Sequence, residues 1–146
     1  MIKKALLIPV NSKGEIFIQD RTDYKPPPWG FFGGSIEDEE THLQAILRET
    51  KEELDLDLVP EDVVYMGDIH TEYDGEFTER YFYLYTTEQV SFTVLEGAGG
   101  KWVTFEEAAP LFKRDNKLDF DPSRMTGDGL VHGIVDHLGK KVMHGF

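Results

Sequence analysis

Two short runs rich in β-forming residues open the chain. They cover residues 5–10 and 15–19, and the segment NSKG between them is rich in residues typical of turns. β-branched and aromatic side chains pack well on a pleated surface, whereas Asn and Gly accept the backbone angles of a tight turn. The pattern predicts a β-hairpin.

A helical period begins after Thr41. Core-compatible positions then recur three and four residues apart, which places them on one face of an α-helix. The stripe consists of Leu43, Ile46, Leu47, Thr50 and Leu54. Thr41 and Gln44 have the spacing of a capping box, in which each side chain satisfies a backbone N–H at the start of a helix. We therefore predict a helix from Thr41 to Leu54.

The rest of the chain favours strands more than helices. Residues 63–73 and 77–87 flank Asp74 and Gly75, a dipeptide that strongly favours a hairpin turn, and the aromatic run at 80–85 is typical of a central strand. Residues 24–34 combine consecutive prolines with glycines, which predicts a loop. The remaining predictions are strands at 55–59, 90–95 and 101–104, an irregular segment at 113–126, and helices at 105–112 and 129–138.

Mixed strands with a few helices predict an α/β (α+β) fold. The 146 residues are 40% hydrophobic, which is enough for a core of ordinary size, and no repeat or long linker divides them. We expect a single domain over residues 1–146.

The charge balance limits the partners of the protein. Lys and Arg number 15 against 28 Asp and Glu, a net charge of −13, so a nucleic-acid backbone would be repelled and no nucleic-acid partner is expected. Carboxylates that hold divalent cations can still bind a polyphosphate, because the metal reverses the local field. The absence of cysteine excludes disulfides, thiolate metal sites and cysteine nucleophiles. The opening MIKKALLIPV has too short an apolar run for a signal peptide, so we expect a cytoplasmic protein without a membrane partner.

Three glutamates share one patch of the predicted helix. At 100° per residue, Glu49, Glu52 and Glu53 fall within an arc of about 100° beside the apolar stripe. Crowded carboxylates either face water or hold a cation, and their hard oxygen atoms suit Mg²⁺ or Mn²⁺. Arg48 is one turn before Glu52 and offsets part of the charge. The alternative is an ordinary solvated acidic face.

The spacing around these glutamates favours the metal site. The segment GGSIEDEETHLQAILRETKEELDL resembles the Nudix box, G-x5-E-x7-R-E-U-x-E-E-x-G-U, where U is a bulky apolar residue. The matching positions are Gly34, Glu40, Arg48, Glu49, Glu52, Glu53 and Leu56.

Two positions of the box depart from the pattern. Thr50 replaces the first U, where its methyl can pack in the core while its hydroxyl bonds to a helix carbonyl. Asp55 replaces the Gly that ends the helix in a left-handed conformation, which Asp tolerates at some cost. Both departures affect stability more than chemistry.

The resemblance to Nudix proteins covers about residues 5–111. The segment WGFFGG at 29–34 looks like the loop that leads into the box, and Glu96-Gly97 followed by Trp102 looks like a later loop that often supplies another acidic ligand. The resemblance implies the Nudix fold, a mixed β-sheet sandwiched between helices. It also implies a small nucleotide-type substrate, and we expect a monomer or homodimer.

The resemblance assigns roles to the box residues. It implies that Glu52 and Glu53 bind a catalytic Mg²⁺ or Mn²⁺ together with the backbone carbonyl of Gly33. Glu49 binds metal or serves as the base, and Glu40 orients Arg48. Such a metal would neutralise a diphosphate and lower the pKa of a bound water, and a carboxylate would then take the proton of the water. The identity of the base stays open between Glu49 and acids on later loops. Of these acids Glu96 is the candidate, both as base and as added metal ligand, although it could equally be an ordinary turn residue.

Candidates for substrate binding lie near the start of the loop. Trp29 and Phe31 can stack on a base, although aromatics beside glycines more often pack within the protein. Arg21 can meet a phosphate, although pairing with Asp20 or Asp23 is an equal alternative.

The function that these residues favour is hydrolysis of a phosphoanhydride bond in a nucleoside triphosphate, a nucleotide sugar or a dinucleotide. Two alternatives stay open: a catalytically silent nucleotide-binding module, and sugar-nucleotide hydrolysis at carbon. A pure binder has no need of three crowded carboxylates, which favours hydrolysis. The absence of cysteine argues against the isomerases of this scaffold, which resemble one another in using a catalytic Cys.

Overall fold

The computed structural model describes residues 2–20, 29–73, 75–95, 99–104 and 106–107. The elements in this part of the chain are β1 (Ile2–Val10), β2 (Glu15–Asp20), β3 (Trp29–Gly30), β4 (Phe32–Ser35), α1 (His42–Leu54), the 3₁₀ turn η1 (Pro60–Asp62), β5 (Val63–Tyr73), β6 (Glu76–Thr86) and β7 (Gly99–Thr104). Within it, no helix has both the length and the apolar character needed to cross a membrane.

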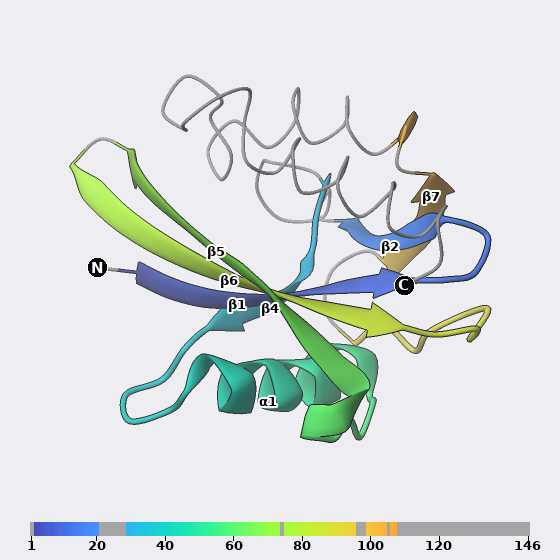
Figure 1. The fold of residues 1–146 in the computed structure, drawn as a ribbon, viewed down its shortest axis with the longest axis horizontal. Helices are drawn as coiled ribbons and strands as arrows, with labels where there is room; N and C mark the ends of the chain where they lie inside the picture. The colour runs from blue at the N-terminus through green and yellow to red at the C-terminus, as the bar shows by residue number, and fades with distance from the viewer. Residues whose placement is uncertain (1, 21–28, 74, 96–98, 105, 108–146) are drawn as a thin grey trace.

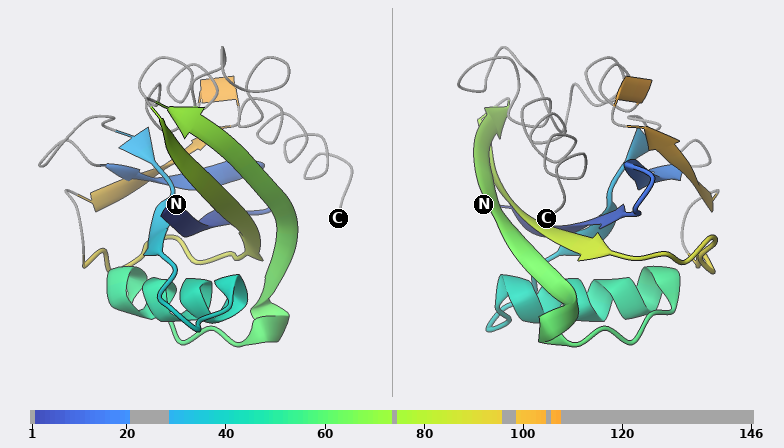
Figure 2. Two further views of the ribbon diagram at one scale, coloured as in Figure 1. Left: turned by 90° about the vertical axis from the view of Figure 1, so that its left-hand side faces the viewer. Right: turned by 45° about the vertical axis from the view of Figure 1, so that its right-hand side comes forward.

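The strands form one mixed, twisted sheet, and α1 lies against one of its faces (Figures 1 and 2). Along the sheet the order is β3-β2-β1-β6-β5, with β4 also paired to β1 and β7 to β2. β1 and β6 run parallel in register from Ile2 opposite Thr78 to Val10 opposite Thr86, whereas the other pairs are antiparallel. The predicted fold class is confirmed.

Both predicted hairpins are present. β1 and β2 pair around the NSKG turn, and β5 and β6 pair around Asp74-Gly75. The aromatic run at 80–85 lies in β6, which has β1 on one side and β5 on the other. It is therefore a central strand, as its composition predicts.

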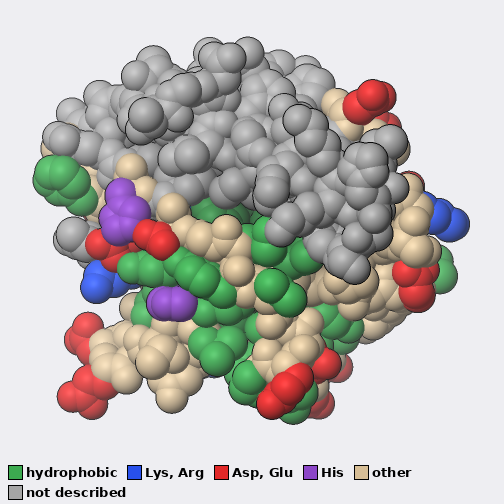
Figure 3. Space-filling model, viewed as in Figure 1, with side chains coloured by type: hydrophobic (Ala, Val, Ile, Leu, Met, Phe, Trp, Pro, Cys, Tyr) green, Lys and Arg blue, Asp and Glu red, His purple; other side chains and the backbone are tan. Residues whose placement is uncertain are grey.

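The main core lies between α1 and the sheet. Alternate residues of β1, Ala5 and Leu7, face Ala45 and Ile46 of α1, because side chains in a strand alternate between the two faces. The other buried members of this cluster are Phe17, Phe32, Leu54, Val63 and Tyr83. On the face shown in Figure 3, the described Lys and Arg side chains lie apart from one another, at opposite sides of the view.

The caps of α1 follow the sequence signals. At the N-terminus, Gln44 N–H donates to Thr41 Oγ1 at 3.0 Å and Thr41 N–H donates to Gln44 Oε1 at 2.9 Å, which completes the capping box. At the other end Asp55 is left-handed, with φ 53° and ψ 39°. Thr50 is buried, and its hydroxyl donates to the Ile46 carbonyl at 2.6 Å. The structural expectations for both departures from the box are confirmed.

Three predicted elements are wrong within the described residues. Residues 55–59 form no strand. Leu56 and Leu58 pack against the core, which explains the alternation, but the backbone pairs with no strand and enters η1 at Pro60. Residues 90–95 also form no strand. The expected loop at 24–34 contains β3 and the start of β4, whose residues Phe32 to Ser35 pair with β1. The helices predicted at 129–138 and, for the most part, at 105–112 lie outside the described residues, as does the segment 113–126.

We predict that Asp55→Gly changes the free energy of unfolding by no more than about 1 kcal/mol. Glycine relieves the strain of the left-handed cap but adds unfolded-state entropy, and the exposed ion pair from Lys51 Nζ to Asp55 Oδ1, 2.9 Å long, contributes little. Urea unfolding measures this difference. Turnover should be unchanged, and a loss of turnover in a variant of normal stability would mean that Asp55 acts in the site.

Candidate active site

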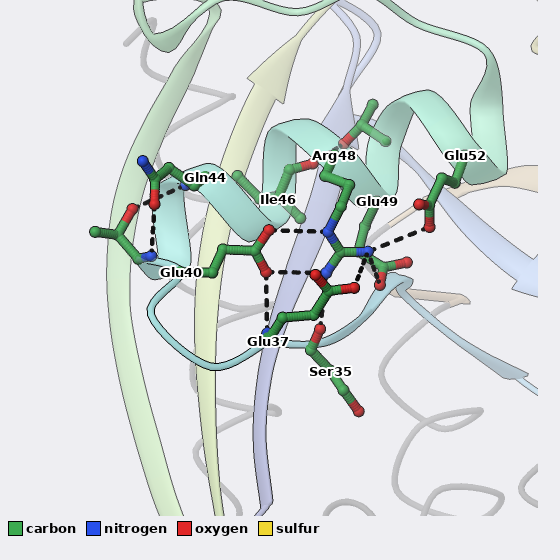
Figure 4. A network of polar contacts seen from close by, with 10 residues as sticks. Ser35, Glu37, Glu40, Gln44, Ile46, Arg48, Glu49 and Glu52 are labelled. Atoms are coloured by element: carbon green, nitrogen blue, oxygen red, sulfur yellow. Dashed lines mark hydrogen bonds and ion pairs between the residues drawn. The ribbon is translucent and has the colours of Figure 1, made fainter.

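Arg48 connects the middle of α1 to the loop that precedes it (Figure 4). Its Nε and Nη2 donate to the two carboxylate oxygens of Glu40 at 2.9 and 3.0 Å, a bidentate arrangement. Nη2 also donates to the Ser35 carbonyl at 3.0 Å, at the end of β4. The contact between Glu40 and Arg48 that the resemblance implies is therefore present, and it fixes the loop between β4 and α1 against the helix.

The same guanidinium reaches two of the predicted ligand residues. Arg48 Nη1 donates to Glu49 Oε1 at 3.0 Å and to Glu52 Oε2 at 3.2 Å. Because one nitrogen serves both carboxylates, Glu49 and Glu52 are drawn towards each other in spite of their like charge. Their joint orientation depends on Arg48.

The pKa values in this network show which groups keep their charge. The hydrogen bond from Arg48 lowers the pKa of Glu40, and the backbone N–H of Glu37 adds to this effect. The hydrogen bond to Glu40 in turn raises the pKa of Arg48 above its already high ordinary value. Both partners therefore stay ionised throughout the neutral and mildly acidic range.

Two glycines let the backbone of β4 pass close to the carboxylates. Gly33 N–H donates to Glu53 Oε2 at 2.7 Å, and the Glu53 side chain is almost fully buried, with 2% of the residue exposed. Gly33 has φ 141°, and a Cβ there would lie 2.0 Å from the Ala5 carbonyl oxygen. At Gly34 a Cβ would lie 2.7 Å from Glu49 Oε1. Only glycine fits either position without displacing a neighbour.

The three glutamates differ in their access to solvent. Glu53 is buried, the Glu49 side chain is 12% exposed and the Glu52 side chain is 57% exposed. The exposure of the three carboxylates therefore rises from the buried Glu53 beside Gly33 to Glu52, which faces water. Such an arrangement suits the binding of a cation that arrives from solvent.

The donor set fits a hard divalent cation. Carboxylate oxygens on successive turns of one helix, beside a glycine backbone, are the ligands that Mg²⁺ and Mn²⁺ prefer. As the side chains stand, no three acidic or histidine groups among the described residues meet closely enough to enclose an ion. The reason is visible in the contacts: Glu49 and Glu52 turn to Arg48, and Glu53 turns to the Gly33 N–H. A bound cation would share these carboxylates with their hydrogen-bond donors, because a carboxylate has two oxygens with about four lone-pair sites.

The structure describes only some of the predicted substrate residues. Phe31 is 5% exposed and its ring meets Phe82 edge-on, with the centroids 6.2 Å apart, which is the kind of contact that the packing alternative predicts. A role of Phe31 in substrate binding stays a prediction. Arg21, Glu96 and the side chain of Trp29 lie outside the described residues.

One contact at the carboxylates was missed by the reasoning from sequence. Leu95 N–H donates to the backbone carbonyl of Glu53 at 2.7 Å. The two residues are far apart in the chain, and no local pattern marks a single N–H as the partner of a helix carbonyl. The alternating apolar positions at 90–95 predict side chains that pack against the core, as Phe92 and Val94 do, but the same alternation is also typical of a strand.

A model of the NUDIX domain matches residues 3–123 of the chain. The chain belongs to the NUDIX domain family. The family membership and enzyme class predicted from the box, a Nudix pyrophosphohydrolase, are thereby confirmed. None of the curated proteins matches the chain.

Several solved structures share this Nudix fold over the whole chain. The E. coli dihydroneopterin triphosphate pyrophosphohydrolase is 17% identical with a TM-score of 0.67, covering 98% of this chain and 96% of its own. A C. elegans Ap4A hydrolase is 19% identical with a TM-score of 0.64 and covers 100% of both chains. A MutT structure from work on Aliivibrio salmonicida and Vibrio cholerae is 26% identical with a TM-score of 0.60, covering 99% and 98%.

We predict that Gly34→Ala lowers turnover by about tenfold to a hundredfold while the protein stays folded. The added Cβ must displace the Glu49 carboxylate, and outer-shell disturbances of metal sites cost activity of this order. Steady-state kinetics beside a thermal melt would check this. Normal turnover would show that the position of the Glu49 carboxylate does not matter to the reaction.

Proposed function

We propose that this Nudix protein hydrolyses a phosphoanhydride bond in a nucleoside-diphosphate-linked substrate, using water and Mg²⁺, with Mn²⁺ as a substitute. The observation that carries the proposal is the gathering of Glu49, Glu52 and Glu53 around Arg48 and the Gly33 backbone. The substrate class is a nucleoside triphosphate, a nucleotide sugar or a dinucleotide. The names of the pyrophosphohydrolase and Ap4A hydrolase that share the fold support a nucleotide-type anhydride.

In this mechanism Glu52, Glu53 and the Gly33 carbonyl would hold the cation. When bound, the cation neutralises the diphosphate and makes a water more acidic. Gly33 N–H keeps the buried Glu53 carboxylate in place, and Arg48 keeps Glu49 and Glu52 pointing to the same side. Because Glu40 balances the charge of Arg48, the guanidinium orients the ligands without repelling the cation strongly.

A carboxylate then takes the proton of the attacking water. Glu49 and Glu96 are the two candidates, and Glu96 is also a candidate for an added metal ligand. Support for Glu96 comes from the sequence: Glu96-Gly97 followed by Trp102 looks like a later loop that often supplies another acidic ligand. Arg21, Trp29 and Phe31 remain our candidates for substrate contacts. A monomer or homodimer and a cytoplasmic location stay predictions.

A panel assay tests the proposed function. Nucleoside triphosphates, nucleotide sugars and dinucleotides are incubated with the protein and Mg²⁺, and nucleotide, pyrophosphate and phosphate products are measured. We expect release of a nucleoside monophosphate from at least one class, with activity rising on the alkaline side of neutral and abolished by excess chelator. Activity that survives the chelator contradicts the metal mechanism. Release of free sugar would indicate attack at carbon, and no turnover of any compound would favour a binding module.

Two substitutions separate the box from the later loop. Glu53→Gln keeps the shape of the side chain but removes its charge, so kcat should fall by roughly 10² to 10⁴, which corresponds to about 3 to 5 kcal/mol. Glu96→Gln should lower turnover by a similar factor at unchanged metal affinity if Glu96 is the base, and should leave both within about threefold if it is a turn residue. Glu61→Gln, at an exposed residue of η1, is the matched control. Near-normal turnover of Glu53→Gln at saturating Mg²⁺ would refute the site.

A further inference from the structure

Residues 87–95, which we call the strap, follow β6 and belong to no strand, yet they are held along their length (Figure 1). At the start, Thr87 N–H donates to the Val10 carbonyl at 2.8 Å, at the end of β1. The next residue, Glu88, accepts hydrogen bonds from the N–H and the hydroxyl of Ser12, both at 2.9 Å. The strap therefore starts from a fixed point beside the first hairpin.

The middle of the strap is held by an aromatic cluster. Trp102 Nε1 donates to the Val90 carbonyl at 2.9 Å. The Phe92 ring meets Phe17 edge-on at 4.8 Å and lies 5.8 Å from the Trp102 ring, measured between centroids. Val90 itself is 85% exposed. Phe92 and Val94 are the two strap side chains that pack against the core, and Phe92 is the larger of them. Aromatic pairs such as those of Phe92 add to the apolar area that they bury.

The end of the strap meets the helix that carries the glutamates. The last carbonyls of a helix have no partner within it, and α1 ends at Leu54. Leu95 N–H supplies the partner of the Glu53 carbonyl, at 2.7 Å. Gly33 N–H holds the carboxylate of the same residue. Glu53 is thus fixed at both its backbone and its side chain, each time by a segment outside α1.

We propose that the strap is a positioning element of the carboxylate site. By holding the Glu53 backbone, it sets the affinity of the site for a divalent cation, and Phe92 is its largest side-chain anchor. Phe92 packs against Phe17 and Trp102 and would act on the site only through Leu95, as a positioning residue. This inference rests on the proposed function, because it gives the Glu53 carboxylate a cation to bind.

The first test compares Phe92→Ala with Val90→Ala in the full-length protein. Truncating Phe92 removes the anchor, whereas truncating the exposed Val90 keeps the carbonyl that Trp102 uses. Mn²⁺ binding without substrate is measured by EPR of the free ion. We expect about tenfold weaker binding for Phe92→Ala, within the range for lost outer-shell support, and wild-type binding for Val90→Ala. Phe92→Leu, which keeps an apolar side chain, should restore most of the affinity. If Phe92→Ala does not fold, Leu95→Pro carries the test.

The second test removes the hydrogen bond itself. Leu95→Pro lacks the N–H, whereas Leu95→Ala keeps it and shortens only an exposed side chain. Leu95→Pro should weaken Mn²⁺ binding about as much as Phe92→Ala, and Leu95→Ala should stay within about twofold of wild type. Amide hydrogen exchange adds a readout that needs no metal: in Phe92→Ala, the N–H groups of Leu95 and Asp55 should exchange at least about tenfold faster.

The outcomes separate the two proposals. If the wild-type protein binds Mn²⁺, and the folded Phe92→Ala and Leu95→Pro variants bind it with the same affinity as the wild type, the strap has no positioning role. Unchanged exchange of the Leu95 and Asp55 amides in Phe92→Ala overturns the inference in the same way, whatever the metal result. If the wild-type protein binds no Mn²⁺ and hydrolyses nothing, the proposed function fails by itself, and the exchange result alone then decides whether the strap holds the end of α1.

Discussion

The arrangement of the site depends on one guanidinium. Arg48 lies between a bidentate partner, Glu40, and the two carboxylates of Glu49 and Glu52, and it also binds the last carbonyl of β4. Without it, the loop between β4 and α1 would lose its main tie to the helix, and the like charges of the glutamates would repel each other. The side chains of Arg48 and Glu40 are both mostly shielded from water, at 25% and 14% exposed, so screening weakens their attraction less than at an open surface.

The buried Glu53 carboxylate places a second demand on the fold. A charged group is costly to bury unless hydrogen bonds or a cation compensate it. Here the fold supplies the backbone N–H of Gly33, which donates to Glu53 Oε2 at 2.7 Å. At the next residue, Gly34, a Cβ would lie 2.7 Å from Glu49 Oε1, so β4 also runs close beside α1. The pairing of β4 with β1 and the collision that any Cβ at Gly33 would cause with the Ala5 carbonyl show how closely the strand is placed. The geometry of the site is thus built into the sheet.

The acidity of the chain agrees with this chemistry. A net charge of −13 would oppose the approach of a polyphosphate, and in the function that we propose a cation at the carboxylates would reverse the local field. The graded exposure of the glutamates, from buried Glu53 to the open Glu52, would give such a cation both a fixed ligand and an approach from solvent. The folded protein would then preorganise part of the site, and the cation would complete it.

The sequence by itself determined what depends on neighbouring residues: α1 with its capping box and left-handed end, the two hairpins with their turns, and the carboxylate patch, because these follow from helical spacing and turn chemistry. Only the tertiary structure decided which extended segments pair with another strand. Residues 32–34 belong to the predicted loop but pair with β1, whereas residues 55–59 and 90–95 alternate like strands but pair with none. Alternation records only that every second side chain meets the core; where the backbone N–H groups bond, as that of Leu95 does to Glu53, depends on segments distant in the chain.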